Sequence, residues 1–169
     1  TSRAGSRGPQ AMSSSTSFQL RLSGTGGQGM ILAGRMLTDA LTGLGLKISQ
    51  STTYEPTSRG GVSRCDLVVA PRNVDFPLVT GLDYLLVLAQ AAVGISDGML
   101  KPGAIVVADA QAVTRPPEGA CSLHLLPLME TARSLGNLRI ANVVGLGALL
   151  TFAPVCDFAD LERVVGENA

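Results

Sequence analysis

Tryptophan is absent from the 169-residue sequence, and histidine occurs once, at His124. The three cysteines, Cys65, Cys121 and Cys156, form no CxxC pair. Paired cysteines and clustered histidines are the usual ligands of zinc and of iron–sulfur clusters, so the sequence predicts neither kind of metal site in this chain. An odd number of scattered thiols is typical of the reducing cytosol, and we expect a cytoplasmic protein.

Charged side chains are few, at 15% of the residues, and they balance, because 13 are basic and 13 are acidic. Only two of the basic residues, Lys47 and Lys101, are lysines. A protein that binds nucleic acid or an acidic membrane through bulk charge carries an excess of basic side chains. The balanced charge therefore argues against both classes of partner.

Long apolar runs are missing, although the mean hydropathy of +0.32 is high. The longest stretch without a charge spans residues 140–156 and is interrupted by Asn142, Thr151 and Pro154. A transmembrane helix needs about 20 mostly apolar residues. We therefore interpret this stretch as buried core or as a subunit interface. We also expect no signal peptide, because the first apolar run comes after residue 18 and carries Arg21.

Residues 1–17 are rich in serine, threonine, glycine and proline. Such a segment buries too little apolar surface to offset the entropy that ordering would cost. We expect a disordered lead, part of it left by cloning, with Met12 as a candidate native start. The length of the chain favours a single domain over residues 18–169.

Beyond residue 18, short apolar runs typical of strands alternate with segments in which apolar residues recur at helical spacing. This alternation predicts an α/β fold, Rossmann-like and layered, with a mainly parallel sheet flanked by helices. The expected strands are residues 18–22, 46–51, 62–70, 83–89, 104–109 and 122–126. The expected helices are residues 28–44, 91–100, 127–135, 140–152 and 158–165.

A glycine-rich turn, Gly24-Thr25-Gly26-Gly27-Gln28-Gly29, separates the first expected strand from the first helix. Glycines let a backbone approach a ligand closely, and the free N–H groups that open a helix attract anions. The turn matches the GxGxxG motif, but dinucleotide-binding sites also need an Asp or Glu residue about 20 residues later. Residues 47–52 contain none, so an NAD site is disfavoured, and an NADP site using Arg59 is no better supported. A phosphate-bearing ligand of another kind remains open, as does a purely structural turn.

A second glycine-rich loop runs from Tyr54 to Gly61 and contains Arg59, Gly60 and Gly61 in succession. The planar guanidinium of arginine suits phosphate and carboxylate groups. Loops that follow the first two strands of an α/β sheet lie at the same edge, so we expect both glycine-rich loops to face one ligand. The alternative is a surface turn closed by an ion pair between Arg59 and Glu55.

The expected helix at 140–152 contains one strongly polar side chain, Asn142, and two glycines, Gly145 and Gly147. Glycine inside a helix costs about 1 kcal/mol relative to alanine, so two of them indicate that something packs closely there. Asn142 lies near the start of the helix, where it either caps backbone groups or contacts a ligand.

Two further residues invite a functional interpretation. Asp109 ends an expected strand, at a position where α/β sites often collect polar groups, although strand-end carboxylates are common. His124 follows a strand-like pattern and is interpreted as structural.

Three segments together resemble a known family. They are GTGGQGMILAG at 24–34, TYEPTSRGGVS at 53–63 and NVVGLGALL at 142–150. In this order they resemble the gamma subunit of the 2-oxoacid:ferredoxin oxidoreductases, a family that includes the pyruvate, 2-oxoisovalerate, 2-oxoglutarate and indolepyruvate oxidoreductases. The resemblance extends over about residues 18–165.

The resemblance implies a role within a larger enzyme. Enzymes of this family oxidatively decarboxylate a 2-oxoacid on thiamine diphosphate with Mg²⁺, pass the electrons through iron–sulfur clusters to ferredoxin, and transfer the acyl group to coenzyme A. Those cofactors lie in partner alpha and beta subunits, with a ferredoxin-like delta subunit as an optional fourth. The gamma subunit is associated with coenzyme A binding and with assembly, and we expect it to be inactive alone. The 2-oxoacid itself is not identified, with a slight preference for 2-oxoglutarate.

The resemblance also implies a set of ligand-binding residues and no catalytic residue in this chain. The first loop would line the phosphates of coenzyme A, the second would adjoin them, and the apolar helix would reach the same cleft. The implied residues are Gly24, Gly26, Gly27, Gln28, Gly29, Arg59, Gly60, Gly61 and Asn142.

Two features depart from the family pattern. Glu55 stands where glycine is common, and the sequence ends at Ala169, where family members usually continue. The shorter C-terminus leaves an alternative function open, a free-standing regulatory module that binds a nucleotide or another phosphate-bearing ligand without oxidoreductase partners.

Overall fold

A computed structural model describes residues 17–55 and 61–168 of the chain. Its centre is a six-stranded sheet in the order β2-β3-β1-β4-β5-β6. The strands are β1 (Phe18–Thr25), β2 (Lys47–Tyr54), β3 (Val62–Ala70), β4 (Leu82–Val87), β5 (Leu100–Asp109) and β6 (Cys121–Leu126). The α-helices are α1 (Met30–Gly43), α2 (Leu128–Ser134), α3 (Ala141–Phe152) and α4 (Phe158–Glu167). Short 3₁₀ turns are η1 (Gln90–Ala92), η2 (Gly94–Ser96) and η3 (Leu138–Ile140).

The sheet is mainly parallel, as the sequence predicts. β1, β4, β5 and β6 pair in parallel, whereas β3 pairs antiparallel with both β1 and β2. β2 therefore points in the same direction as β1, and β2 and β3 form a hairpin. The residues between β2 and β3 are too few for the helical crossover that a parallel pair needs.

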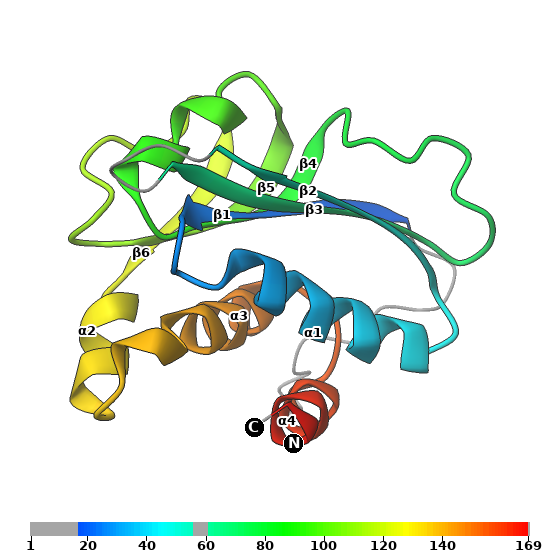
Figure 1. The fold of residues 1–169 in the computed structure, drawn as a ribbon. Coiled ribbons are helices and arrows are strands. Elements are labelled where there is room, and N and C mark those ends of the chain that lie inside the picture. Colours follow the sequence, from blue (N-terminus) through cyan, green and yellow to red (C-terminus); the bar gives the residue numbers. More distant parts are fainter. Residues whose placement is uncertain (1–16, 56–60, 169) are drawn as a thin grey trace, which may run out of the picture.

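The order of the strands puts β1 at the point where the chain changes sides. After β1 the chain builds β2 and β3 on one side, and it then returns to build β4, β5 and β6 on the other. In open α/β sheets, ligands bind at such a switch point, outside the carboxyl ends of the strands. The glycine-rich turn leaves the end of β1 at this position (Figure 1).

Helices α1, α3 and α4 lie on one face of the sheet, and the 3₁₀ turns η1 and η2 lie on the other (Figure 1). The larger core is formed between the sheet and the helices by residues such as Leu22, Leu37, Leu67 and Leu149. A smaller core on the opposite face includes Leu85, Val93 and Val106. Side chains along a strand alternate between the two faces of the sheet, so every second residue of a strand faces the same core.

Glycines let α1 and α3 approach the sheet. A Cβ atom on Gly34 of α1 would overlap the Sγ atom of Cys65 in β3. A Cβ atom on Gly145 of α3 would lie 2.8 Å from Cδ2 of Leu86 in β4. Gly147 differs, because nothing among the described residues lies within 4 Å of that position. The close packing expected at the two glycines of this helix is therefore confirmed for Gly145 and wrong for Gly147.

Several expected element boundaries are wrong. β1 extends through Thr25, so the turn proper begins at Gly26, and β2 extends to Tyr54. The helix expected at residues 91–100 is replaced by η1, η2 and the start of β5. Gly98, with a φ of 75°, has a left-handed conformation that ends any helix there. The lead expected at residues 1–17 lies outside the described residues except for Ser17.

A buried ion pair fixes η2 onto the sheet. Arg21 in β1 is 2% exposed, and its guanidinium donates two hydrogen bonds to Asp66 in β3, at 2.7 and 3.0 Å. A third nitrogen donates to the carbonyl of Ile95, at 2.9 Å, and to the hydroxyl of Ser96, at 3.2 Å. A buried charge is tolerated only when it is paired and hydrogen-bonded in this way.

None of the helices in the described part of the chain is both long enough and apolar enough to cross a membrane. The uncharged stretch at 140–156 instead forms α3 and its C-terminal turn, with Leu146, Leu149 and Leu150 buried. That stretch is therefore core, one of the two interpretations that the sequence left open.

Candidate functional site

The glycine-rich turn between β1 and α1 borders a hollow of about 340 Å³. The end of β2 and the start of β3 form its other side. Its lining consists of Gly26, Gly27, Gly29, Met30, Ile31, Leu32, Tyr54 and Ser63. Among the described residues, the glycine-rich turn, the first turn of α1 and Tyr54 at the start of the second glycine-rich loop therefore face one space.

Two glycines give the turn its shape. Gly27 has a φ of 86° and Gly29 a φ of 76°, left-handed values that favour glycine over other residues. A Cβ atom on Gly27 would meet nothing within 4 Å among the described atoms, so the backbone there is open to a ligand. Gly26 is different, because a Cβ atom there would lie 2.8 Å from the ring of Tyr54.

The first turn of α1 presents hydrogen-bond donors to the hollow. The first helical hydrogen bond runs from the Ala33 amide to the Gly29 carbonyl, at 2.9 Å. The preceding amides of Met30, Ile31 and Leu32 belong to the N-terminal turn, whose donors have no partner within a helix. No side chain caps this end among the described residues, and the first turn of α1 carries no acid. The site is therefore suited to an anion.

The second glycine-rich loop joins the first through backbone atoms. The Gly26 amide donates to the Gly61 carbonyl at 3.0 Å. The bond of 3.0 Å from the Glu55 amide to the Val62 carbonyl instead closes the second loop on itself, at the end of the β2–β3 hairpin. A Cβ atom on Gly61 would overlap the carbonyl oxygen of Glu55, so only glycine fits there. Gly61 is thus next to the turn, whereas Arg59 and Gly60, the other residues expected there, lie outside the described residues.

Gln28 folds beneath the turn and links it to the sheet. Its Oε1 atom accepts a hydrogen bond from the Thr25 amide at 2.8 Å. Its Nε2 atom donates to the Leu88 carbonyl at 3.3 Å. The side-chain oxygen occupies the space that a Cβ atom on Gly24 would need. Gln28 and Gly24 therefore contribute to the support of the turn.

Asn142 links the turn to α3. This residue is 4% exposed, and its Nδ2 atom donates to the Gly29 carbonyl at 3.1 Å. Its Oδ1 atom accepts from the Val143 amide at 2.8 Å. The structure therefore brings Asn142 to the glycine turn, where it caps one backbone group of α3, one of the two roles considered from the sequence.

The sequence motifs did not assign a role to Tyr54 or Arg139, which the structure brings to the turn. Tyr54 is 50% exposed and lies against Gly26. Arg139 contributes to a smaller hollow of about 140 Å³ on the other side of Gly27, together with Gln28, Met129, Leu138 and Ala141. Arg139 directly precedes α3, and α3 contacts the turn through Asn142. The proximity of Arg139 to the turn is therefore evident only from the three-dimensional structure.

The two remaining residues considered from the sequence have structural partners. Asp109 is buried, and its carboxylate accepts hydrogen bonds from the amides of Ala112 and Met129, at 2.8 and 2.9 Å. These contacts attach the end of β5 to the start of α2. His124 stacks on Phe152 with ring centroids 3.7 Å apart, which agrees with its structural interpretation.

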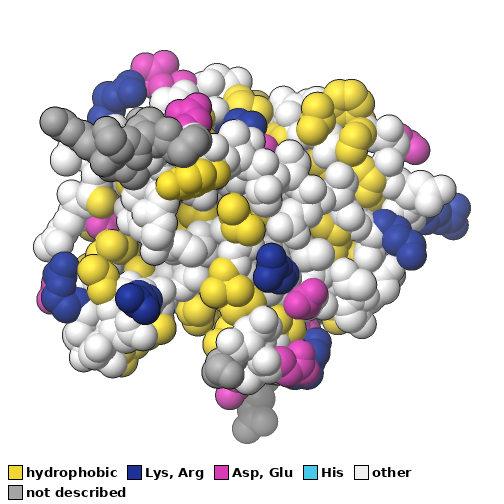
Figure 2. Space-filling model, in the orientation of Figure 1, with side chains coloured by type: hydrophobic (Ala, Val, Ile, Leu, Met, Phe, Trp, Pro, Cys, Tyr) yellow, Lys and Arg dark blue, Asp and Glu magenta, His cyan; other side chains and the backbone are white. Residues whose placement is uncertain are grey.

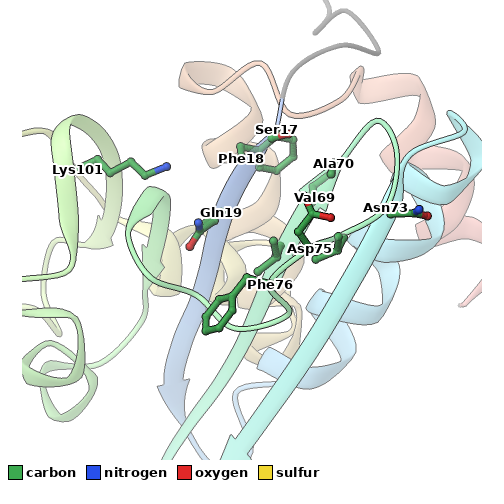
Figure 3. A pocket seen from close by; sticks show the side chains of 11 residues that line it. Ser17, Phe18, Gln19, Val69, Ala70, Asn73, Asp75, Phe76 and Lys101 are labelled. Atoms are coloured by element: carbon green, nitrogen blue, oxygen red, sulfur yellow. The ribbon is translucent and has the colours of Figure 1, made fainter.

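Another hollow, of about 240 Å³, lies at the opposite end of the sheet (Figure 3). Phe18 and Val69, which pair across β1 and β3, line it together with Asn73 and Phe76 of the following loop. Lys101 extends toward this space from β5, and its ammonium group pairs with Asp83 at 3.0 Å. None of the described residues of the three sequence motifs lines this hollow.

Comparisons with known proteins agree on one family. The 2-oxoglutarate synthase subunit KorC of Methanocaldococcus jannaschii is 34% identical over 151 residues, which cover 87% of this chain and 81% of that protein. The ketoisovalerate oxidoreductase subunit VorA of Methanothermobacter thermautotrophicus is 31% identical over 132 residues, 78% of this chain but 28% of that protein.

Solved structures give the same result. The gamma subunit of a keto/oxoacid ferredoxin oxidoreductase from Geobacter sulfurreducens superposes with a TM-score of 0.77 at 30% identity, covering 90% of this chain and 86% of that one. A 2-oxoglutarate:ferredoxin oxidoreductase from Magnetococcus marinus, solved with 2-oxoglutarate, coenzyme A and succinyl-CoA bound, has a TM-score of 0.79 at 21% identity. The match covers 90% of this chain and 27% of that one, and it shows a shared fold.

These relatives are subunits of larger oxidoreductases, and they do not support the alternative of a free-standing regulatory module. The sequence model of the pyruvate ferredoxin/flavodoxin oxidoreductase family matches residues 19–168 of this chain. The resemblance seen in the three sequence motifs is therefore confirmed, and the chain belongs to the pyruvate ferredoxin/flavodoxin oxidoreductase family as a homologue of its gamma subunits.

Proposed function

We propose that this chain is the gamma subunit of a 2-oxoacid:ferredoxin oxidoreductase and that it binds the phosphates of coenzyme A at its glycine-rich turn. The observation that carries the proposal is the turn itself, where open N–H groups of α1 border a hollow that Tyr54 of the second glycine-rich loop also lines. The KorC relatives belong to 2-oxoglutarate synthases, and we infer 2-oxoglutarate as the substrate of the whole enzyme.

The residues at the turn divide between contact and support. The backbones of Gly26, Gly27 and Gly29 line the hollow and would approach the phosphates, while the amides that open α1 would donate to the phosphate oxygens. Tyr54 and Leu32, both partly exposed, offer apolar surface to the organic part of the ligand.

Gly24 and Gln28 lie beneath the turn and act through its shape. Gly61 adjoins the turn, and we keep Arg59 and Gly60 in the proposal from their sequence motif. Arg139 is added as a cation on the far side of Gly27, where it would attract a second phosphate group of the same ligand.

The chemistry of decarboxylation belongs to partner subunits in this proposal. The described residues contain no group of three or more His, Cys, Asp or Glu side chains arranged to hold a metal ion. Alpha and beta subunits would carry thiamine diphosphate, Mg²⁺ and iron–sulfur clusters, with a delta subunit in some assemblies and ferredoxin as the acceptor. We further infer a cytoplasmic enzyme, since the three cysteines are unpaired.

Exposed apolar side chains are available for contacts with those partners. Figure 2 shows several separate apolar patches on the face that carries α1 and α4. Across the described surface the large exposed apolar residues are Leu32, Leu44, Tyr54, Phe76, Leu78, Leu125, Leu135, Leu138 and Phe158. Apolar surface of this kind is common where subunits meet.

Gly27 provides a sharp test, because its φ is positive and the space around it is open. Asparagine and aspartate both tolerate this backbone conformation and have nearly the same size. In the assembled enzyme, Gly27→Asp should raise the KM for coenzyme A about tenfold more than Gly27→Asn, because only aspartate repels the phosphates. The KM for the 2-oxoacid is the internal reference. Equal effects of the two substitutions on the KM for coenzyme A would contradict the proposal.

A further inference from the structure

Asn142 binds the start of α1 through a carbonyl oxygen. Polar side chains at helix N-termini often accept hydrogen bonds from the free amides. At the start of α1, Asn142 instead donates to the Gly29 carbonyl, at 3.1 Å, and no side chain among the described residues accepts from the amides. Asn142 therefore holds the turn through the carbonyl oxygen of Gly29, and the first amides of α1 stay open to the hollow.

The same carbonyl also begins α1. The Gly29 oxygen accepts from the Ala33 amide at 2.9 Å, so one atom receives hydrogen bonds from both α1 and α3. Asn142 is held from the other side, because its Oδ1 atom accepts from the Val143 amide. Both polar atoms of this side chain thus have partners within the protein, and the residue is only 4% exposed.

Packing adds to the hydrogen bond. A Cβ atom on Gly29 would lie 2.6 Å from Nδ2 of Asn142, so the side chain fills the space beside a left-handed glycine. The peptide between Gly29 and Met30 then has little freedom to rotate. Its orientation sets the direction of the first amides of α1.

We propose that Asn142 is a positioning residue, which fixes the Gly29 peptide and thereby aims the open amides of α1 at the ligand without touching the ligand itself. This inference rests on the proposed function, and it changes the role that the sequence resemblance gave to Asn142. It couples α3, and Arg139 just before it, to the geometry of the glycine-rich turn.

The test uses the assembled enzyme with Asn142→Ala and with Asn142→Leu, which keeps about the size of the side chain, adds no charge and lacks the donating NH₂ group. Loss of the hydrogen bond to the Gly29 carbonyl should raise the KM for coenzyme A about fivefold in either variant. Amide hydrogen exchange of residues 29–33, measured without coenzyme A, should become faster in both variants, because the turn loses its restraint before any ligand binds.

Leu150→Ala is the matched control, because Leu150 is buried at the other end of α3. It should lower the stability of the chain without changing the KM for coenzyme A or the exchange at residues 29–33. Unchanged exchange in the Asn142 variants together with a raised KM would overturn the proposal in favour of direct contact with the ligand. An unchanged KM would overturn it in favour of a role in folding alone.

The Gly27 and Asn142 variants together distinguish failure of the positioning role from failure of the proposed coenzyme A site. If Gly27→Asp raises the KM for coenzyme A well above Gly27→Asn while the Asn142 variants change nothing, the positioning role fails and the binding site stands. If the two Gly27 variants do not differ, the binding site itself is refuted.

Discussion

The amide of Gly26 donates a hydrogen bond of 3.0 Å to the carbonyl of Gly61, and this bond joins the two glycine-rich loops of the chain. The two residues lie at the carboxyl end of β1 and just before β3, the antiparallel neighbour of β1. β2 and β3 form a hairpin, so the loop between them returns to the edge of the sheet from which α1 starts. A ligand held at the turn is therefore within reach of both motifs.

Two glycines of α3 should respond in opposite directions to the same substitution. Gly145→Ala would force a methyl group against Leu86 in a filled core, which typically costs about 1–3 kcal/mol of stability. Gly147→Ala meets nothing in the described structure and should stabilise the helix by about 1 kcal/mol. Urea unfolding of the purified full chain measures both effects. If the free energy of unfolding changed in the same direction in both variants, the packing described for α3 would be refuted.

The buried pair of Arg21 and Asp66 should be costly to break. Asp66→Asn leaves the Arg21 guanidinium buried without its counter-ion, and such changes typically cost about 3–5 kcal/mol of stability. The exposed pair of Arg163 and Glu167 is the comparison, because Glu167→Gln should cost less than about 0.5 kcal/mol. Similar losses in the two variants, measured by urea unfolding, would argue against a buried ion pair.

Alkaline pH should destabilise the chain through two thiols. Burial, followed by the charge of Asp66, raises the pKa of Cys65 from 9.0 to about 12. Burial, followed by the charges of Asp160 and Asp157, does the same for Cys156. The thiols ionise more readily in the unfolded chain, so their contribution is complete below pH 9 and is lost as the pH rises toward 12.

Between pH 8 and pH 10, each of these thiols should lower the free energy of unfolding by about 1.4 kcal/mol. The double variant Cys65→Ala/Cys156→Ala is less stable at neutral pH, because it leaves cavities, but its stability should decline less steeply above pH 9. Parallel pH profiles for the variant and the unchanged chain would show that the two thiols do not carry this dependence.

Local patterns predicted much of the fold. The alternating strands and helices, the turn before α1 and the apolar α3 are visible as periodicity and as glycine positions. The direction of β3 was not predicted, although the short loop after Tyr54 is a signal for a hairpin. The helix predicted at residues 91–100 does not form, because its apolar periodicity is weak and the segment contains Gly94 and Gly98. The chain forms 3₁₀ turns there instead.

The candidate site was predictable in its backbone and less so in its side chains. The four glycines at 24–29 predict that another group approaches the backbone closely, because glycine has no Cβ atom in the way. The supporting roles of Gln28 and Asn142 depend on partners 60 and 113 positions away in the sequence, which no local pattern encodes. Arg139 comes to the turn only because α3 packs beside α1.

Purification of this chain from its native source under anaerobic conditions, through an affinity tag, tests the central claim most directly. The recovered material would be assayed for coenzyme A-dependent reduction of an acceptor by 2-oxoglutarate and by three other 2-oxoacids. The account predicts larger partner subunits that bring thiamine diphosphate and iron, and turnover that requires coenzyme A. Recovery of the chain alone, or of a thiamine-containing complex whose turnover does not depend on coenzyme A, would contradict it.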